Sequence, residues 1–285
     1  MFGSHLSIAG GLVNALLEAE RLTMDTVQIF TKNQQQWRTP PLKEEARLAW
    51  LAKLSDLGWE DRTVSHNSYL INLASPDDEL WEKSIDLMRE EIERCEALSV
   101  PFLVIHPGAY TTSSPSRGIK RIGKALKQLH RELPGYRTIV CLENTAGAGS
   151  TMGRTFEELQ AIREAVTQPE RLGYCLDSCH LLAGGYDIRS EEAGLAVLEE
   201  FENLCGLADL RVLHLNDSKG ELGSRRDRHE HIGDGHVGRE GLKAFVRHPD
   251  LRHVPKILET AKTKTAKGTP MDTVNLRRLR RLAAT

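Results

Sequence analysis

The sequence predicts an α/β fold, a (β/α)8 TIM barrel. Eight short apolar segments alternate with longer segments of helical periodicity from one end of the chain to the other. A length of 285 residues also suits eight such units. The alternative is a doubly wound open sheet, but no Gly-x-Gly-x-x-Gly turn follows the first expected strand. We therefore expect a single (β/α)8 domain over residues 1–285.

The eight strands are expected where Val, Ile and Leu form short, nearly continuous runs. Such runs are typical of strands that are buried on both faces. They cover residues 2–6, 26–30, 63–66, 102–106, 138–143, 172–177, 211–216 and 255–259.

Helical periodicity marks the clearest of the intervening helices. Apolar side chains at intervals of three and four predict two amphipathic helices, through Trp81, Ile85, Met88, Ile92 and Cys95 and through Ile119, Ile122, Leu126, Leu129 and Leu133. We expect Ser75 to cap the first of these helices and Pro76 to begin it. Thr155 and Glu158 have the spacing of a capping box at the start of a later helix.

The composition is that of an ordinary globular protein, with 40% apolar and 27% charged residues. These values exclude a disordered or fibrous chain, and no apolar run approaches the roughly 18–20 residues of a membrane span. The first residues, Met-Phe-Gly-Ser-His, lack the charged and apolar segments of a secretory signal. Five scattered cysteines favour buried, reduced thiols. We expect a cytoplasmic protein with no membrane partner.

The charge balance is nearly neutral, with 38 basic against 40 acidic residues and a net charge of −2. This balance argues against binding to nucleic acid through a uniformly basic surface, although a local basic groove remains compatible with it. The unusual feature is the presence of eleven histidines. Six of them lie where a functional site is expected.

Histidines and carboxylates recur where the expected strands end. In a TIM barrel these ends meet at one rim, and the loops of that rim carry function. The residues at the strand ends are His5, His66, His106, Glu143, Asp177, His214 and Glu259. From His66 to Glu259 the successive separations are 40, 37, 34, 37 and 45 residues, which are lengths of single βα units. Each side chain is therefore expected at the next position around the rim.

Three further donors are expected beside them. His180 follows Asp177 by one helical turn, and Asp227 and His229 alternate in a segment after the seventh strand, which points both side chains the same way. Mixed imidazole and carboxylate ligands suit zinc, or manganese where oxygen ligands dominate. Apart from His5, nine donors exceed the needs of one tetrahedral ion, so we expect two or three ions. Neighbouring metal ions are the usual device for phosphate-ester hydrolysis.

The same residues lie in sequence blocks that are characteristic of a known family. The blocks cover residues 66–73, 106–108, 142–147, 175–180, 214–217 and 227–229 and read HNSYLINL, HPG, LENTAG, CLDSCH, HLND and DRH. The chain resembles endonuclease IV, the zinc-dependent apurinic/apyrimidinic (AP) endonuclease family of base excision repair. The resemblance extends along nearly the whole chain.

The resemblance implies three Zn²⁺ ions, with Mn²⁺ compatible at one position. By motif match, the ions are held by His66, His106 and Glu143; by Glu143, Asp177, His214 and Glu259; and by His180, Asp227 and His229. Glu143 would bridge two ions and act as the catalytic residue. The implied reaction is hydrolysis of the phosphodiester 5′ to an abasic site by metal-activated hydroxide, which leaves a 3′-hydroxyl and a 5′-deoxyribose phosphate.

The implied partner is duplex DNA that contains an abasic site, and no obligate protein partner is expected. Two segments match the DNA-penetrating loops of the family, and their contacting residues would be Asn33, Gln35, Gln36, Tyr69 and Leu70. The family commonly has an arginine at the position of Gln35. A glutamine side chain cannot supply the charged, stackable group of an arginine.

Two other functions are alternatives to this one. The first is a metal-dependent sugar isomerase or epimerase on the same kind of barrel, which needs only one or two ions and would leave His180, Asp227 and His229 surplus. The second is a catalytically inactive binder of DNA lesions, which would be expected to lose a carboxylate ligand. Outside the ligand motif, we expect His5 to hydrogen-bond to a ligand or phosphate, and His130 to face solvent.

Overall fold

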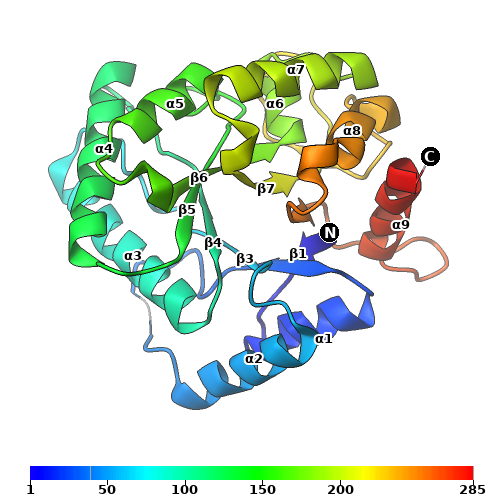
Figure 1. Cartoon of the computed structure of the whole chain (residues 1–285), viewed down its shortest axis with the longest axis horizontal. Coiled ribbons are helices and arrows are strands. Elements are labelled where there is room, and N and C mark those ends of the chain that lie inside the picture. The colour runs from blue at the N-terminus through cyan, green and yellow to red at the C-terminus, as the bar shows by residue number, and fades with distance from the viewer. Residues whose placement is uncertain (39, 285) are drawn as a thin grey trace.

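The structure, a computed structural model, describes residues 1–38 and 40–284 and contains a closed barrel of eight parallel strands (Figure 1). Around the barrel the order is β1-β10-β7-β6-β5-β4-β3-β2. The strands are β1 (Phe2–His5), β2 (Thr26–Ile29), β3 (Val64–His66), β4 (Phe102–Ile105), β5 (Ile139–Glu143), β6 (Leu172–Asp177), β7 (Leu210–His214) and β10 (Lys256–Leu258). The predicted (β/α)8 barrel is confirmed, and each expected strand agrees with an observed one to within two residues at either end.

Helices cover the outside of the barrel (Figure 1). The described α-helices are α1 (Val13–Arg21), α2 (Glu44–Leu57), α3 (Asp78–Ala97), α4 (Pro115–Glu132), α5 (Phe156–Glu164), α6 (Ser178–Gly184), α7 (Glu191–Leu204), α8 (Gly238–Arg247) and α9 (Met271–Ala284). Short 3-10 turns are η1 (Pro169–Arg171), η2 (Leu207–Asp209) and η3 (Pro249–Leu251). No helix in the described part of the chain is both long enough and apolar enough to cross a membrane.

Apolar side chains form two separate layers on the two faces of the strands. The larger one lies between the barrel and the helices and includes Val27 and Ile29 of β2. The smaller one, the interior layer, takes one fully buried residue from each of six strands: Val64, Val104, Cys141, Cys175, Val212 and Ile257. Because successive side chains of a strand point to opposite faces, the interior layer fills the barrel and fixes which neighbours face its axis.

The starts of two helices differ in detail from expectation. Helix α3 begins at Asp78, and its N-cap is Asp77, whose Oδ1 accepts a hydrogen bond from the backbone N–H of Leu80 at 2.8 Å. The expectation that Ser75 caps this helix and Pro76 begins it was wrong, because Ser75 Oγ instead accepts from the N–H of Asp77, in a turn before the helix.

The expected capping box of α5 is only half formed. Thr155 is the N-cap and accepts from the N–H of Glu158 at 3.4 Å. The Glu158 carboxylate reaches past Thr155 to the N–H groups of Gly153 and Arg154, at 2.8 and 3.0 Å. It therefore anchors the preceding loop as well as the helix.

Two further features depart from the sequence interpretation. His130 of α4 was expected to face solvent but is 4% exposed, with neither ring nitrogen hydrogen-bonded to a described residue. Strand β7 ends at His214 rather than at residue 216, because the N–H of Asn216 turns to Ser178 Oγ. An unexpected two-stranded hairpin follows it, β8 (Asp217–Ser218) with β9 (His229–Glu230).

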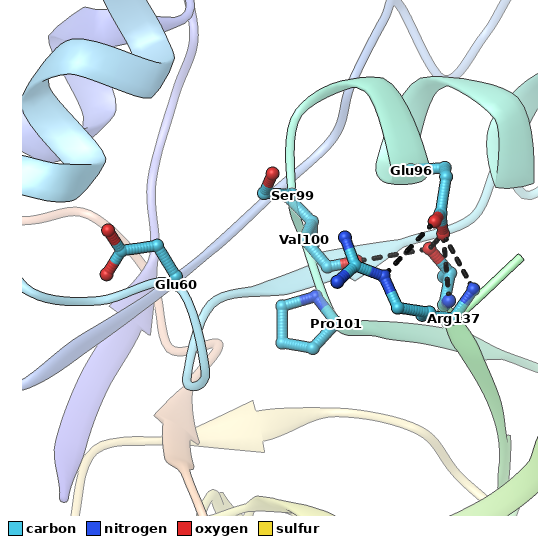
Figure 2. Close-up of a pocket in the computed structure, with 7 residues that line it drawn as sticks. Glu60, Glu96, Ser99, Val100, Pro101 and Arg137 are labelled. Carbon is cyan, nitrogen blue, oxygen red and sulfur yellow. Dashed lines mark hydrogen bonds and ion pairs between the residues drawn. The ribbon is translucent and has the colours of Figure 1, made fainter.

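A hollow lies at the N-terminal end of the strands, lined by Glu60, Glu96, Ser99, Val100, Pro101, Arg137 and Thr138 (Figure 2). The Glu96 carboxylate accepts from the backbone N–H groups of Arg137 and Thr138, each at 3.0 Å. Glu96 thus ties α3 to the start of β5. In TIM barrels this end is associated with stability rather than with catalysis, and the functional site lies at the opposite end.

Candidate metal centre

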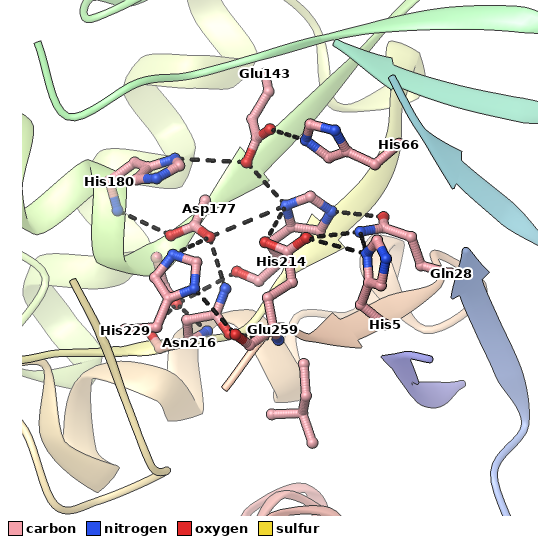
Figure 3. Close-up of polar contacts among 12 residues, drawn as sticks. His5, Gln28, His66, Glu143, Asp177, His180, His214, Asn216, His229 and Glu259 are labelled. Atoms are coloured by element: carbon pink, nitrogen blue, oxygen red, sulfur yellow. Dashed lines mark hydrogen bonds and ion pairs between the residues drawn. The ribbon is translucent and has the colours of Figure 1, made fainter. Parts of the chain in front are cut away.

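Six of the predicted donors project into the mouth of the barrel because of strand alternation. Each lies two residues beyond a member of the interior layer and therefore faces the same way. The pairs are Val64 and His66, Val104 and His106, Cys141 and Glu143, Cys175 and Asp177, Val212 and His214, and Ile257 and Glu259. Figure 3 shows five of these donors meeting at the C-terminal end of the strands: His66, Glu143, Asp177, His214 and Glu259.

His180 joins them through a helix cap. Asp177 is the last residue of β6 and also the N-cap of α6, and its Oδ1 accepts from the N–H of His180 at 2.8 Å. This cap places both side chains at the top of β6. The Asp-Ser-Cys-His segment therefore provides two donors from one strand end.

Asp227 and His229 approach from the β8–β9 hairpin. One oxygen of Asp227 lies 3.2 Å from Nε2 of His229, and the other lies 3.2 Å from Nε2 of His180. The Asp227 side chain is 48% exposed, whereas that of His180 is 2% exposed. This set forms the outer part of the centre.

All nine predicted donors converge in the structure. Three sets have their donor atoms within 4.8 Å of one another: His66, His106 and Glu143; Glu143, Asp177, His214 and Glu259; and His180, Asp227 and His229. Cys175 and Cys179 also lie within this distance of some donors. Burial raises the pKa of both thiols, to about 12 for Cys179, which disfavours the thiolate that a metal ion would need.

Hydrogen bonds on the outer side of the imidazoles orient their inner nitrogens. Nδ1 of His66 lies 3.0 Å from the carbonyl oxygen of Asn67, and Nδ1 of His180 lies 2.9 Å from that of Asn144. Because a carbonyl oxygen can only accept, these Nδ1 atoms carry the proton. In the neutral form of each ring, Nε2 then keeps a lone pair that points into the centre, as metal-binding histidines require.

Charges inside the centre shift the pKa values of both partners. Burial favours the neutral imidazole of His214, but the carboxylates of Glu259 and Glu143 outweigh burial and raise its pKa to about 9. Burial would raise the pKa of the Glu143 carboxyl, yet the imidazoles around it, His214 first, hold its pKa well below the usual range. The Glu143 carboxylate therefore stays ionised, and its negative charge attracts protons or metal cations.

The donors fit divalent metal ions. Nε2 of His180 and Nε2 of His229 are buried, and their 3.2 Å contacts with the Asp227 carboxylate lack hydrogen-bond geometry. With neutral imidazoles, the four carboxylates carry four negative charges in a mostly buried space, which is unfavourable without compensating cations. Imidazole nitrogens and carboxylate oxygens are a donor set that zinc accepts.

Gln28 of β2 is a polar residue of the centre that the sequence interpretation missed. Its amide nitrogen lies 2.7 Å from Oε1 of Glu259 and 3.0 Å from Nδ1 of His5 (Figure 3). His5 is therefore linked to Glu259 mainly through Gln28, while its own Nδ1 lies 3.7 Å from Oε1 of Glu259. A sequence signal existed: Gln28 alternates with Val27 and Ile29, which face the helices, so Gln28 must face the barrel axis.

Asn216 is a second missed residue. Its Nδ2 donates to Oδ2 of Asp177 at 2.7 Å, and its Oδ1 accepts from the N–H of Glu259 at 2.7 Å. One side chain thus ties two donors of the same set together. Its position just after the seventh strand, in the block that reads HLND, was the available signal.

The five residues expected to contact DNA lie on two loops beside the centre. Asn33, Gln35 and Gln36 are exposed, and Asn33 Oδ1 accepts from the N–H of Gln35 at 2.9 Å. Tyr69 is 65% exposed and packs edge-on against Phe30, with 5.7 Å between the ring centroids. Leu70 is half-buried and packs against the core. The exposed side chains of both loops therefore frame the mouth.

Comparisons with known proteins agree with this geometry. The family described as "Xylose isomerase-like TIM barrel" matches residues 16–280. "Probable endonuclease 4" of Chloroflexus aggregans is 41% identical over 283 residues, which are 99% of this chain and 99% of that protein. The chain belongs to the endonuclease IV family. The crystal structure of endonuclease IV from Thermus thermophilus has a TM-score of 0.86 and 36% identity, and covers 99% of this chain and 98% of that one.

The barrel of the endonuclease IV family also occurs in other solved structures. A D-tagatose 3-epimerase-like protein matches with a TM-score of 0.71 at 18% identity, over 99% of this chain and 98% of that chain. At this identity the match shows the shared fold alone. The function must therefore be argued from the donors and loops at the mouth.

Proposed function

We propose that this chain is a zinc-dependent AP endonuclease that hydrolyses the phosphodiester 5′ to an abasic site in duplex DNA. The products would be a 3′-hydroxyl and a 5′-deoxyribose phosphate. The observation that carries the proposal is the convergence of nine imidazole and carboxylate donors in three sets at the mouth of the barrel. Membership of the endonuclease IV family supports it.

The three sets would each hold one Zn²⁺, and Glu143 would belong to two of them. When bound, zinc supplies Lewis-acid chemistry, which makes water nucleophilic near neutral pH and stabilises negative charge on a leaving oxygen. The chain orients the donors: the carbonyl of Asn67 fixes the His66 ring, and the side chain of Gln28 fixes that of His214. Glu143 aligns the two sets that share it, and we assign it as the catalytic residue.

The two exposed loops would recognise the lesion. A duplex that lacks one base has lost stacking at that position, so bending and opening it there cost less free energy. Side chains can then wedge into the gap from the minor groove. Tyr69 is exposed beside His66, with 5.8 Å between the ring centroids, and can enter such a gap. Leu70 is half-buried, so we expect it to contribute less than Tyr69.

The outer donor set argues against a sugar isomerase or epimerase. Such an enzyme needs one or two ions, which the sets that share Glu143 would supply. Asp227 and His229 come from the hairpin and have no task in that reaction. For a phosphodiester, by contrast, a third cation beside the other two adds positive charge where the phosphate would lie.

Incision of a defined duplex tests the proposal. The substrate is a duplex with one tetrahydrofuran abasic analogue, and the same protein sample is assayed for metals by elemental analysis. We expect a single cut 5′ to the analogue, a 3′-hydroxyl product and close to three zinc ions per chain. A zinc-loaded protein that leaves the duplex intact but interconverts free ketoses would establish the alternative function.

A further inference from the structure

A buried carboxylate on α3 connects the two loops that frame the mouth. Glu91 is 1% exposed, and its Oε2 accepts from Oγ1 of Thr31 at 3.0 Å, at the start of the loop that follows β2. Its Oε1 accepts from the N–H of Ser68 at 3.3 Å, in the loop that follows β3. One side chain of a long helix thus contacts both loops.

Lys32 extends the connection into the first loop. Its Nζ lies 3.6 Å from Oε1 of Glu91, and both side chains are 2% exposed. The same Nζ donates to the carbonyl oxygens of Asn33 and Gln36, at 3.2 and 3.0 Å. The buried ion pair therefore holds the backbone on both sides of Gln35. Breaking one partner of such a pair is costly, because the other charge stays buried without compensation.

The two loops are also bonded directly to each other. Ser68 Oγ donates to the carbonyl oxygen of Gln34 at 2.6 Å and accepts from the N–H of Leu70 at 3.3 Å. Ser68 thus joins the turn that presents Gln35 to the turn that presents Tyr69 and Leu70. Arg94, one helical turn after Glu91, donates to the carbonyl oxygens of Thr31 and Pro40 and ties the same loop to α3.

We infer that Glu91, Lys32 and Ser68 are positioning residues that hold the two loops as one rigid unit for recognition of the abasic site. The inference rests on the proposed function and extends it to three residues that do not touch DNA. Glu91 and Lys32 are buried at the base of the loops, so their effect on DNA must pass through the exposed residues. Rigid loops enter a gap without losing conformational freedom on binding, which favours the lesion over intact duplex.

Three variants test the inference. The pair Glu91→Gln with Lys32→Met removes both buried charges together and leaves neither one unpaired. Ser68→Ala removes one hydroxyl, and it provides the test if the double variant Glu91→Gln, Lys32→Met does not fold. Glu93→Gln makes the same chemical change at an exposed position of α3 and is the matched control. Affinities for duplex with and without one tetrahydrofuran site are measured at one salt concentration, in a Glu143→Gln background that does not cut.

We expect the ratio of abasic to intact affinity to fall at least about fivefold for the pair and for Ser68→Ala, and to stay unchanged for Glu93→Gln. Affinity for intact duplex and zinc content should stay within about twofold of the Glu143→Gln background, because the three variants change no further donor. With Glu143 restored, KM for the abasic duplex should rise while kcat stays within about twofold. In a Tyr69→Ala background the same changes should cause no further loss, because residues that act through one another are not additive.

An unchanged ratio for both the pair and Ser68→Ala would overturn the inference. A loss that adds fully to that of Tyr69→Ala would also overturn it, because the three residues would then act independently of the wedge. Both results leave the proposed function standing as long as the wild-type protein cuts the abasic duplex. Failure of the wild-type protein to cut or to prefer that duplex would instead refute the proposed function itself.

Discussion

Oε1 of Gln28 lies 2.8 Å from Nε2 of His214, and this contact determines which nitrogen of His214 faces the centre. The Gln28 amide nitrogen must face the Glu259 carboxylate, which can only accept, so the amide oxygen faces the imidazole. In the neutral ring Nε2 of His214 therefore carries the proton, and Nδ1 points to the carboxylates of Glu143 and Glu259, at 2.8 and 3.2 Å. His66 and His180 have the opposite arrangement, with Nδ1 protonated.

Replacement of Gln28 by Leu should weaken zinc binding about 10- to 100-fold, because the His214 ring loses the partner that fixes its protonation and orientation. The measurement is zinc retained after equilibration with graded concentrations of a chelator. Gln160→Leu on α5, where Gln160 bonds only to Glu164 among the described residues, is the matched control. Equal retention in wild type and Gln28→Leu would show that Gln28 does not support the site.

Glu143→Gln should reduce incision at least about 100-fold, because the change removes a negative charge shared by two donor sets. The fold should persist, since the amide is similar in size and the barrel does not depend on this charge. Incision rates and thermal unfolding of the two proteins provide the comparison. More than about a tenth of the wild-type rate would contradict the assigned role.

Chelation should remove the metal in two stages. The outer set includes Asp227, which is 48% exposed, whereas Glu143, which the other two sets share, is 1% exposed. One ion is therefore expected to leave early and the remaining ions slowly, since their release requires opening of the mouth. Elemental analysis over time follows the loss, and added zinc should restore incision. Full incision by protein shown to be free of metal would exclude the metal mechanism.

Tyr69→Ala should weaken binding to abasic duplex about 5- to 150-fold, the range expected for loss of roughly 1–3 kcal/mol of stacking. Leu70→Ala should have a smaller effect in the same direction. Binding to intact duplex, which is mainly phosphate contact, should barely change at a fixed salt concentration. An unchanged ratio of the two affinities would mean that the loop with Tyr69 and Leu70 does not recognise the abasic site.

Gln35→Arg should tighten binding to abasic duplex. Gln35 is exposed, and an arginine there adds a charge and a planar group that stacks or pairs with phosphate. The control is the same change at Gln160 on α5, which bonds to Glu164 of the same helix. Weaker abasic binding by Gln35→Arg alone would show that this chain uses the position differently from its family.

Stability should depend on pH through His130. Burial, and then the charge of Arg171, lower the pKa of the His130 ring to about 4. The unfolded chain binds this proton near pH 6.5, so the contribution of His130 to stability is complete above pH 6.5 and is lost as the pH falls toward 4. His130→Leu should therefore match wild type at pH 7 and exceed its unfolding free energy by about 2 kcal/mol at pH 4.5. His253→Leu, at an exposed position, is the control, and urea unfolding is the measurement.

The barrel and most of its donors could be predicted because the signals are local. Each of six donors ends an apolar run, and the run itself fixes both the strand and the direction of its last side chain. The hairpin could not be predicted, because strands of two residues such as His229–Glu230 are too short to show a period. Its register instead depends on contacts with Asp217, which accepts from the N–H groups of Gly233, Val237 and Gly238.

Buried polar residues were the main part of the structure that the sequence did not predict. Glu91 resembles the exposed Glu93 in the sequence, and only its spacing from Met88 and Cys95 places it on the buried face of α3. Its partners, Thr31 and Ser68, lie on loops whose conformation the sequence pattern does not determine. A polar residue at an apolar helical position is thus a useful signal for a buried network, although it does not reveal the partners.

The origin of the outer donors has a consequence for how this barrel could change over time. Six donors belong to strand ends, which the barrel needs in order to close, whereas Asp227 and His229 belong to a hairpin inserted after β7. The insertion can be shortened or exchanged without disturbing the strand ladder. Its loss would leave the two sets that share Glu143 intact. Asp227 and His229 therefore form a detachable part of the outer set, and on the proposed function the gain or loss of this one hairpin would be enough to alter the chemistry of the scaffold.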